Sequence, residues 1–211
     1  MFKFAFIVAI LCAAALSAAD MRLLSDSEKT EISAKLSEVA RNTKSIHSSF
    51  VQVKNISVLS EKIRSSGVFY FKKDNMIRWE YQKPYKYIII YNGSKVFIND
   101  DGKTTQFDAK ANRIFQEING TILSSMKGVI TENPNFSVSF FKLQNKYLVK
   151  LSPKSNDLLK YVTRIEIYFD DKYLAVTEMN IYEKSGDYTN IVFKNREFNK
   201  NIPDSIFNTG M

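Results

Sequence analysis

From residue 50 onward the sequence alternates apolar and polar residues, and short groups of turn-forming residues interrupt the alternation. Successive side chains of a β-strand point to opposite faces, so a period of two predicts strands with one buried face. Asn92-Gly93 and Asp101-Gly102 tolerate positive φ angles and are typical of tight hairpin turns. Hairpins in series predict one large antiparallel sheet of about ten to eleven strands. The strands are expected at residues 50–53, 68–71, 76–81, 87–91, 95–98, 136–143, 147–151, 162–169, 173–182 and 188–198.

Two segments have the spacing of helices instead of strands. Residues 25–46 place apolar side chains near a period of 3.6, and Ser25 or Ser27 can cap the start of this helix. Residues 109–129 have similar spacing, and Asn119-Gly120 predicts a break between two short helices. A large twisted sheet tends to curl, and so few helices leave much of its apolar face uncovered. The curled sheet either packs as a solid core or encloses a cavity, and the residue pattern leaves both open.

The segment around the single tryptophan shows how the two faces of one strand differ. Strand parity places Ile77 and Trp79 on the inner face, and it predicts that Arg78 and Glu80 lie on the outer, solvated face. After Pro84 the sequence is almost wholly apolar. Such a run predicts a strand that is covered on both faces, with the helices covering one of them.

Residues 1–19 have the features of a signal peptide. A short basic start precedes an apolar run at residues 4–16, and small residues stand before Asp20. The apolar run is shorter than the roughly 20 residues that a membrane-spanning helix needs. We therefore expect cleavage after Ala19, export across the inner membrane, and a single domain over residues 20–211.

The residue types that support catalysis are scarce in this chain. Cys12 is the single cysteine and lies in the expected signal peptide, so the mature chain has no disulfide and no thiolate ligand. His47 is the single histidine, which argues against histidine-rich metal centres and Cys–His catalysis. Asp100-Asp101 and Asp170-Asp171 stand where hairpin turns are expected, so turn formation is favoured over calcium binding or glycosidase chemistry. The sequence predicts a protein that is not an enzyme and that uses no metal and no cofactor.

The formal net charge of the chain is +8, and its basic residues are dispersed along the sequence instead of forming one block. A basic surface can suit anionic lipid or an acidic protein partner. Export argues against nucleic acid as the partner. An evenly solvated basic surface without a specific partner is the alternative.

Residues 48–100 carry an ordered set of motif positions. These are Phe50, Gln52, Gly67, Phe69, Phe71, Lys72-Lys73, Ile77, Trp79, Pro84, Ile89, Asn92-Gly93 and Phe97. The set resembles the characteristic segment of the periplasmic outer-membrane lipoprotein carrier family, LolA. The strands at residues 146–195 also resemble the closing strands of that family, so the resemblance covers nearly the whole chain after the signal peptide.

The resemblance implies an incomplete, half-open antiparallel β-barrel, mainly β with α, that is closed by a helical lid. It implies a periplasmic chaperone that binds the acyl chains of lipoproteins in a hydrophobic cavity and shuttles them to the outer membrane. The implied partners are lipid-modified proteins, an inner-membrane lipoprotein-releasing ABC transporter, and an outer-membrane receptor or the membrane itself. The expected carrier is a monomer.

Strand parity and the resemblance together select candidate residues for the cavity, the lid and a latch. In the family an arginine after the third strand bonds to the lid backbone and holds the empty form closed. The matching residue here is Lys73, followed by Asp74 where the family usually has proline, and a solvated turn residue is the alternative for Lys73. The acyl-chain cavity is expected to be lined by Phe50, Phe69, Phe71, Ile77, Trp79, Tyr81 and Ile89. The lid is expected to include Leu36, Ala40, Ile114, Ile118, Ile122 and Met126, for which plain core packing is the alternative.

Two other functions are compatible with the same half-barrel. One is a lipid-sensing regulatory module of envelope stress, and the other is a carrier of free lipid or glycolipid. An untypical hydrolase is a more distant alternative. Recovery of an acylated protein together with the purified chain would separate the lipoprotein carrier from all three.

Overall fold

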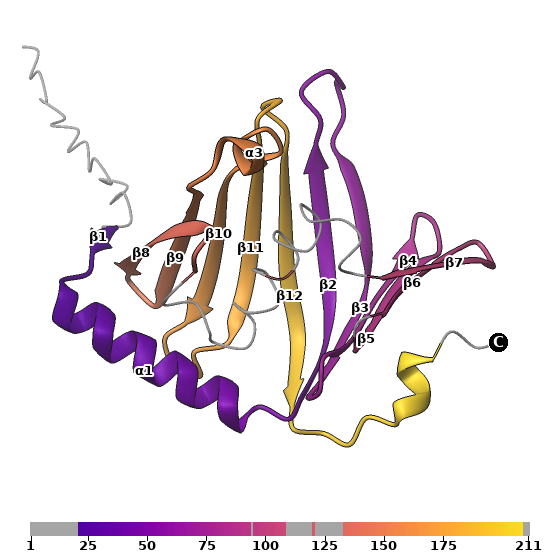
Figure 1. The fold of residues 1–211 in the computed structure, drawn as a ribbon, viewed down its shortest axis with the longest axis horizontal. Helices are drawn as coiled ribbons and strands as arrows, with labels where there is room; N and C mark the ends of the chain where they lie inside the picture. The colour runs from indigo at the N-terminus through magenta and orange to yellow at the C-terminus, as the bar shows by residue number, and fades with distance from the viewer. Residues whose placement is uncertain (1–20, 94, 109–119, 121–132, 209–211) are drawn as a thin grey trace, which may run out of the picture.

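A single antiparallel sheet of twelve strands organises the part of the chain that the structure describes, in the order β1-β8-β9-β10-β11-β12-β2-β3-β4-β5-β6-β7 (Figure 1). The computed structural model describes residues 21–93, 95–108, 120 and 133–208. β1 and β7 stand at the two edges and do not pair with each other, so the sheet is an open half-barrel, as predicted. The strands are β1 Arg22–Leu23, β2 Ser45–Asn55, β3 Ile63–Lys72, β4 Met76–Lys83, β5 Tyr87–Asn92, β6 Lys95–Asp100, β7 Lys103–Asp108, β8 Phe136–Leu143, β9 Lys146–Pro153, β10 Val162–Asp170, β11 Val176–Glu183 and β12 Tyr188–Phe198.

The differences from the expected strands lie at the edges and in one turn. The two-residue β1 pairs with β8, and β7 pairs with β6; neither was predicted. β7 reads Lys-Thr-Thr-Gln-Phe-Asp and offers too few apolar positions for a clear alternation. The strand expected from residue 173 begins later, at Val176, because Leu174 has a φ of 51° and lies in the turn after β10.

Helix α1, Asp26–Asn42, begins as expected but ends earlier than its apolar spacing predicted. Ser25 is the N-cap and forms a capping box with Glu28, in which each side chain accepts from the other residue's backbone N–H. Thr43 leaves helical geometry with a ψ of 110°. Ile46, which was expected on the helix, lies in β2. Both residues are β-branched, and such side chains favour the extended conformation.

α1 packs across one half of the sheet, and the face that it contacts is called the inner face below. Ile32 and Leu36 are 4% and 2% exposed because they pack into a cluster on β8, β9, β10 and β11. The short helix α3, Asn156–Leu159, closes the end of this first cluster with Leu158. The other members of the first cluster are Phe136, Phe140, Val149, Leu151, Val162, Ile165, Ile167, Phe169 and Met179.

A second cluster occupies the other half of the inner face, on β2, β3, β4 and β12. Strand register fixes its membership, because Phe69 pairs with Trp79 and Phe71 pairs with Ile77 across β3 and β4. Trp79 and Tyr81 are partly buried against it. Its buried members are Phe50, Phe69, Phe71, Ile77, Ile191 and Phe193. The inner face is therefore apolar in both halves, while the buried side chains of α1 pack on the first.

Several expectations fall outside the described residues. They are the signal peptide at residues 1–19, almost all of the helices expected at residues 109–129, and the lid residues Ile114, Ile118, Ile122 and Met126. Within the described ranges, no helix is long and apolar enough to cross a membrane.

The C-terminal segment covers the outer face of the sheet at β4 and β5. It contains a short 3-10 helix, η2, at Asp204–Phe207. Ile202 and Phe207 pack on Ile90 of β5 and form a third cluster with it. Lys72 fixes the segment because its Nζ donates to the Ile202 carbonyl oxygen at 2.9 Å and also pairs with the Asp204 carboxylate.

The outer face of β4 was predicted to be solvated, and this prediction is wrong because the C-terminal segment covers it. The side chains of Arg78 and Glu80 are only 18% and 25% exposed, and they form an ion pair at 2.8 Å. Arg78 Nη1 also donates to the Ile206 carbonyl oxygen at 3.1 Å. The apolar run after Pro84 is covered on its outer face by this C-terminal segment, so the cover on that face comes from a segment distant in sequence.

Gly67 allows β3 and β4 to approach closely where their register shifts. A Cβ atom at residue 67 would lie 1.8 Å from the carbonyl oxygen of Glu80 on the neighbouring strand. Such a contact is possible only for glycine unless the backbone of β4 moves.

We expect Gly67→Ala to lower the free energy of unfolding by about 3 kcal/mol or more, because the added methyl group overlaps main-chain atoms. Chemical denaturation followed by circular dichroism measures this loss. Gly93→Ala is the matched control, because a Cβ there would meet no atom within 4 Å and only its φ of 63° causes strain. That strain is about 1 kcal/mol. Equal losses in the two variants would contradict the close approach of β3 and β4.

Candidate ligand-binding cavity

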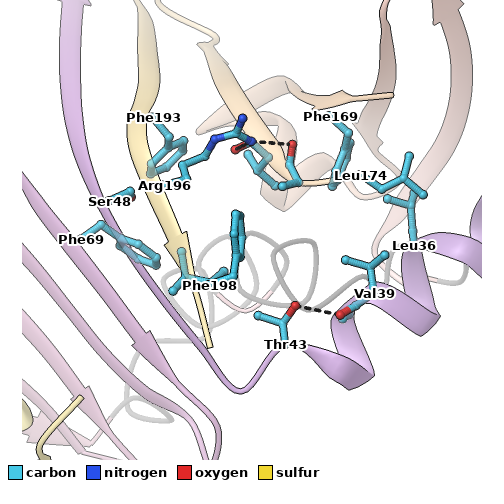
Figure 2. Close-up of a pocket in the computed structure, with 14 residues that line it drawn as sticks. Leu36, Val39, Thr43, Ser48, Phe69, Phe169, Leu174, Phe193, Arg196 and Phe198 are labelled. Atoms are coloured by element: carbon cyan, nitrogen blue, oxygen red, sulfur yellow. Dashed lines mark hydrogen bonds between the residues drawn. The ribbon is translucent and has the colours of Figure 1, made fainter. Parts of the chain in front are cut away.

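An apolar cavity lies where the C-terminal half of α1 meets the inner face of β2, β3 and β12 (Figure 2). The turn between β10 and β11 forms another side of it. Its volume is about 40 Å³, whereas pockets for small molecules have volumes of roughly 300–1,000 Å³. A ligand of that size would fit only if α1 or the sheet moved. The described lining residues are Leu36, Val39, Ala40, Thr43, Ile46, Ser48, Phe69, Phe169, Leu174, Ala175, Val176, Phe193, Arg196 and Phe198.

Three aromatic side chains lie close to Trp79 on the inner face. The ring centroids of Phe50 and Phe69 each lie 5.1 Å from that of Trp79, and that of Phe193 lies at 5.8 Å. Of the residues expected in the cavity, Phe69 lines it, and the others lie farther along the inner face. Phe50, Phe71, Ile77, Trp79 and Tyr81 belong to the second cluster, and Ile89 is half-buried on β5 opposite Trp79.

The two described lid residues, Leu36 and Ala40, line the cavity from the side of α1. Leu36 also packs into the first cluster, so it joins the buried core to the cavity wall. Ala40 borders a further hollow at the end of the helix, which Phe71 and Lys73 also line. α1 is thus a wall of the cavity along its C-terminal half.

Lys73 connects the turn after β3 to the C-terminal end of α1. Its Nζ donates to the Arg41 carbonyl oxygen at 2.6 Å, and its backbone N–H donates to the Lys44 carbonyl oxygen at 2.9 Å. Arg41 lies in the last turn of α1, where carbonyl groups lack partners within the helix and carry partial negative charge. A cation at this position stabilises α1 in its place over the cavity.

A family model described as outer membrane lipoprotein carrier protein LolA matches residues 41–209. The chain belongs to the LolA family. It is 32% identical over 174 residues to an outer-membrane lipoprotein carrier protein of Francisella philomiragia, covering 78% of this chain and 81% of that protein. A protein of the same name from Methylococcus capsulatus is 26% identical over 169 residues, covering 79% of this chain and 77% of that one.

A solved structure shows the same fold. The crystal structure of a DUF1329 family protein from Desulfovibrio piger matches with a TM-score of 0.50 and 14% identity, covering 87% of this chain and 97% of that one. At this identity the likeness concerns the fold alone.

The turn after Lys73 has a backbone conformation that proline cannot take. Asp74 and Asn75 have φ angles of 72° and 63°. Proline is restricted to a φ near −65°, so the proline that the family usually carries cannot take the conformation of Asp74. Asn and Asp tolerate such angles and form tight hairpin turns.

Arg196 is a charged residue of the cavity wall that sequence reasoning missed. Its Nη1 donates to the Asp170 carboxylate at 2.8 Å and to the carbonyl oxygens of Ala175 and Val176 at 3.2 and 3.1 Å. These contacts join β12 to the turn between β10 and β11. Asp170 thus ends a strand beside a turn, as expected, and also neutralises the cation in the wall.

A bulge in β12 turns Arg196 toward the cavity. The register of β12 with β2 shifts around Asn195, whose φ is 51°. An extra residue reverses the parity of a strand, so residues that would face outward face inward after it. The sequence carries a signal of this shift, because the inner apolar positions pass from the odd-numbered Phe193 to the even-numbered Phe198.

Tyr81 is a largely buried phenol on β4. Its hydroxyl donates to Gln52 Oε1 at 2.9 Å, and burial raises the pKa of Tyr81 to about 12. The protonated phenol is thus favoured in the folded state. Burial also raises the pKa of Tyr91 on the neighbouring strand.

We expect the free energy of unfolding to decrease as the pH rises from about 10 to about 12. The pKa of Tyr81 is higher in the folded chain than in the unfolded chain, so its contribution is complete below pH 10 and is lost above it. Tyr81→Phe keeps the ring and removes this titration. Its free energy of unfolding should therefore fall by up to about 2 kcal/mol less than that of the wild type over this pH range. Tyr85→Phe is the control, because Tyr85 is 81% exposed. Denaturation curves at several pH values measure the slopes, and equal slopes for Tyr81→Phe and wild type would contradict the assignment.

Proposed function

We propose that this protein is a periplasmic carrier that binds the acyl chains of lipoproteins and takes them from the inner membrane to the outer membrane. The observation that carries the proposal is the apolar second cluster, which continues from the cavity wall beside the C-terminal half of α1. The relatives from Francisella philomiragia and Methylococcus capsulatus are named outer-membrane lipoprotein carrier proteins, which supports lipoproteins as the cargo.

Burial of an acyl chain on the second cluster supplies the binding energy. A methylene group contributes about 0.8 kcal/mol, so a chain of about fifteen methylenes contributes roughly 12 kcal/mol before ordering and opening costs. Since the cavity has a volume of only about 40 Å³, α1 or the sheet must move before an acyl chain can reach this surface. The free energy of opening then limits how tightly the carrier holds its cargo.

The Lys73 contact gives a physical basis for release. In the empty protein it holds the end of α1 at the Arg41 carbonyl oxygen, and binding of an acyl chain competes with this closed form. Lysine lacks the planar fork of arginine, so its hold on the helix is weaker than the family's latch. A weaker latch favours loading and slows release.

The proposal includes a donor and an acceptor for the cargo. The donor is an inner-membrane lipoprotein-releasing ABC transporter, and the acceptor is an outer-membrane receptor or the membrane. Removal of residues 1–19 takes away Lys3 and no acidic residue, so the formal net charge falls from +8 to +7. This positive charge speeds encounter with an acidic partner face, so association should slow as salt is added. The carrier acts as a monomeric domain of residues 20–211, after a signal peptide at residues 1–19, and without catalysis.

The fluorescence of Trp79 tests cargo binding directly. It is the only tryptophan of the chain, and it lies among Phe50, Phe69 and Phe193 on the inner face. An acylated peptide should shift its emission, because the chain displaces these rings or changes the polarity around the indole. The same peptide without its acyl chain should not, and equal shifts would exclude recognition of the acyl group.

Co-purification separates the carrier from its alternatives. The protein expressed in the periplasm with a lipoprotein should recover that lipoprotein in roughly one-to-one amounts, as expected for one cavity. Recovery of free lipid alone would indicate a lipid carrier. Recovery of a membrane-bound regulator of envelope stress would indicate a sensor.

We expect Lys73→Leu to hold acylated cargo about fivefold more tightly or better and to transfer it more slowly. The substitution removes a charge-assisted hydrogen bond of the closed form, which shifts the population toward open protein. Transfer of a labelled lipoprotein to acceptor membranes measures the effect. Lys86→Leu, at an exposed position before β5, is the control for lost charge. Unchanged transfer by Lys73→Leu would place the latch elsewhere.

A further inference from the structure

Ser48 brings a hydroxyl group into the cavity wall without a hydrogen-bond partner among the described residues. The residue is 1% exposed, and it pairs across strands with Phe69, so its side chain lies on the inner face (Figure 2). Burial of a hydroxyl without a partner is unfavourable, and such groups in folded proteins require an explanation. Neighbouring hydroxyls do have partners: Thr43 donates to the Val39 carbonyl oxygen at 2.7 Å, and Ser45 donates to that of Lys200 at 2.6 Å.

The surroundings of Ser48 are apolar with no net charge. Phe69 and Phe193 line the cavity beside it, and Arg196 lies across from it at the bulge in β12. The guanidinium group of Arg196 is already paired with the Asp170 carboxylate at 2.8 Å. A second carboxylate in this wall would therefore lack a free counter-charge, and its burial would be unfavourable. The site suits a neutral hydrogen-bond acceptor that is attached to apolar groups.

We propose that the Ser48 hydroxyl donates a hydrogen bond to the carbonyl oxygen of an acyl ester bound in the cavity. The inference rests on the proposed function and defines the ligand further, as a neutral glyceride-type ester instead of a bare hydrocarbon chain or a free fatty acid. The apolar second cluster holds the chain, and Ser48 fixes the depth at which the carbonyl group sits.

The test compares two ligands that differ only at the carbonyl group. They are 1-palmitoylglycerol, an ester, and 1-hexadecylglycerol, its ether counterpart, titrated into the full protein with Trp79 fluorescence as the signal. The wild type should bind the ester about threefold to tenfold more tightly, the range for one hydrogen bond. Ser48→Ala should remove this preference. Ser49→Ala is the matched control, because the Ser49 hydroxyl donates to the Lys194 carbonyl oxygen at 3.2 Å instead of lining the cavity, and it should keep the preference.

A stability measurement separates ligand recognition from a structural role. The empty Ser48→Ala protein should unfold at the same denaturant concentration as the wild type or at a higher one, because the substitution removes an unpartnered buried hydroxyl. An ester with a ¹³C-labelled carbonyl should show its carbonyl infrared band at lower frequency in the wild type than in Ser48→Ala. A destabilised Ser48→Ala protein that loses both ligands equally would overturn the proposal.

The remaining outcomes distinguish this inference from the proposed function. Equal binding of ester and ether by the wild type would overturn the Ser48 subsite while leaving acyl-chain binding intact. Tighter binding of palmitate than of the ester would overturn the neutral character of the site. Failure of all three ligands to bind would overturn the proposed function and, with it, the subsite.

Discussion

The packing of α1 on one half of the inner face determines how the rest of the molecule is arranged. Ile32 and Leu36 bury the helix in the first cluster, while the second half of the same face is equally apolar. A single helix of this length cannot cover twelve strands. The cavity therefore lies at the boundary, where the end of α1 passes from the first cluster toward the second. Among the described residues, the cavity thus follows from the incomplete cover that α1 gives to the sheet.

Strand parity predicted the inner face well, because alternation depends on the backbone of each strand alone. Phe69 and Trp79 share a face since their period of two is uninterrupted. Arg196 could not be placed in this way, because one extra residue near Asn195 reverses the parity of the end of β12. The burial of Arg78 could not be predicted from its own strand either, because the segment that covers it comes from the far end of the chain. The position of Lys73 at α1 came from resemblance to the family, since no local pattern predicts a contact with a distant helix.

Lysine and arginine side chains connect separate elements at the borders of the apolar clusters. Lys72 and Lys73 are adjacent, yet one binds the C-terminal segment on the outer face and the other binds the end of α1. The alternation of side chains along a strand separates them in this way. Arg196 does the same within the cavity wall, where it joins β12 to the turn after β10 and satisfies its charge with Asp170. At each of these three positions one cation joins two elements by hydrogen bonds, where a larger apolar core would have joined them by packing.

The free edges of the sheet have a mechanical consequence. In a closed barrel, the number of strands and their stagger fix the interior diameter. Here β1 and β7 do not meet, so the curvature of the sheet can relax while every pair of neighbouring strands keeps its main-chain hydrogen bonds. The sheet that bounds the interior can therefore bend, whereas a closed barrel keeps a fixed diameter. The width of the interior is therefore set by the stiffness of the twelve described strands against bending.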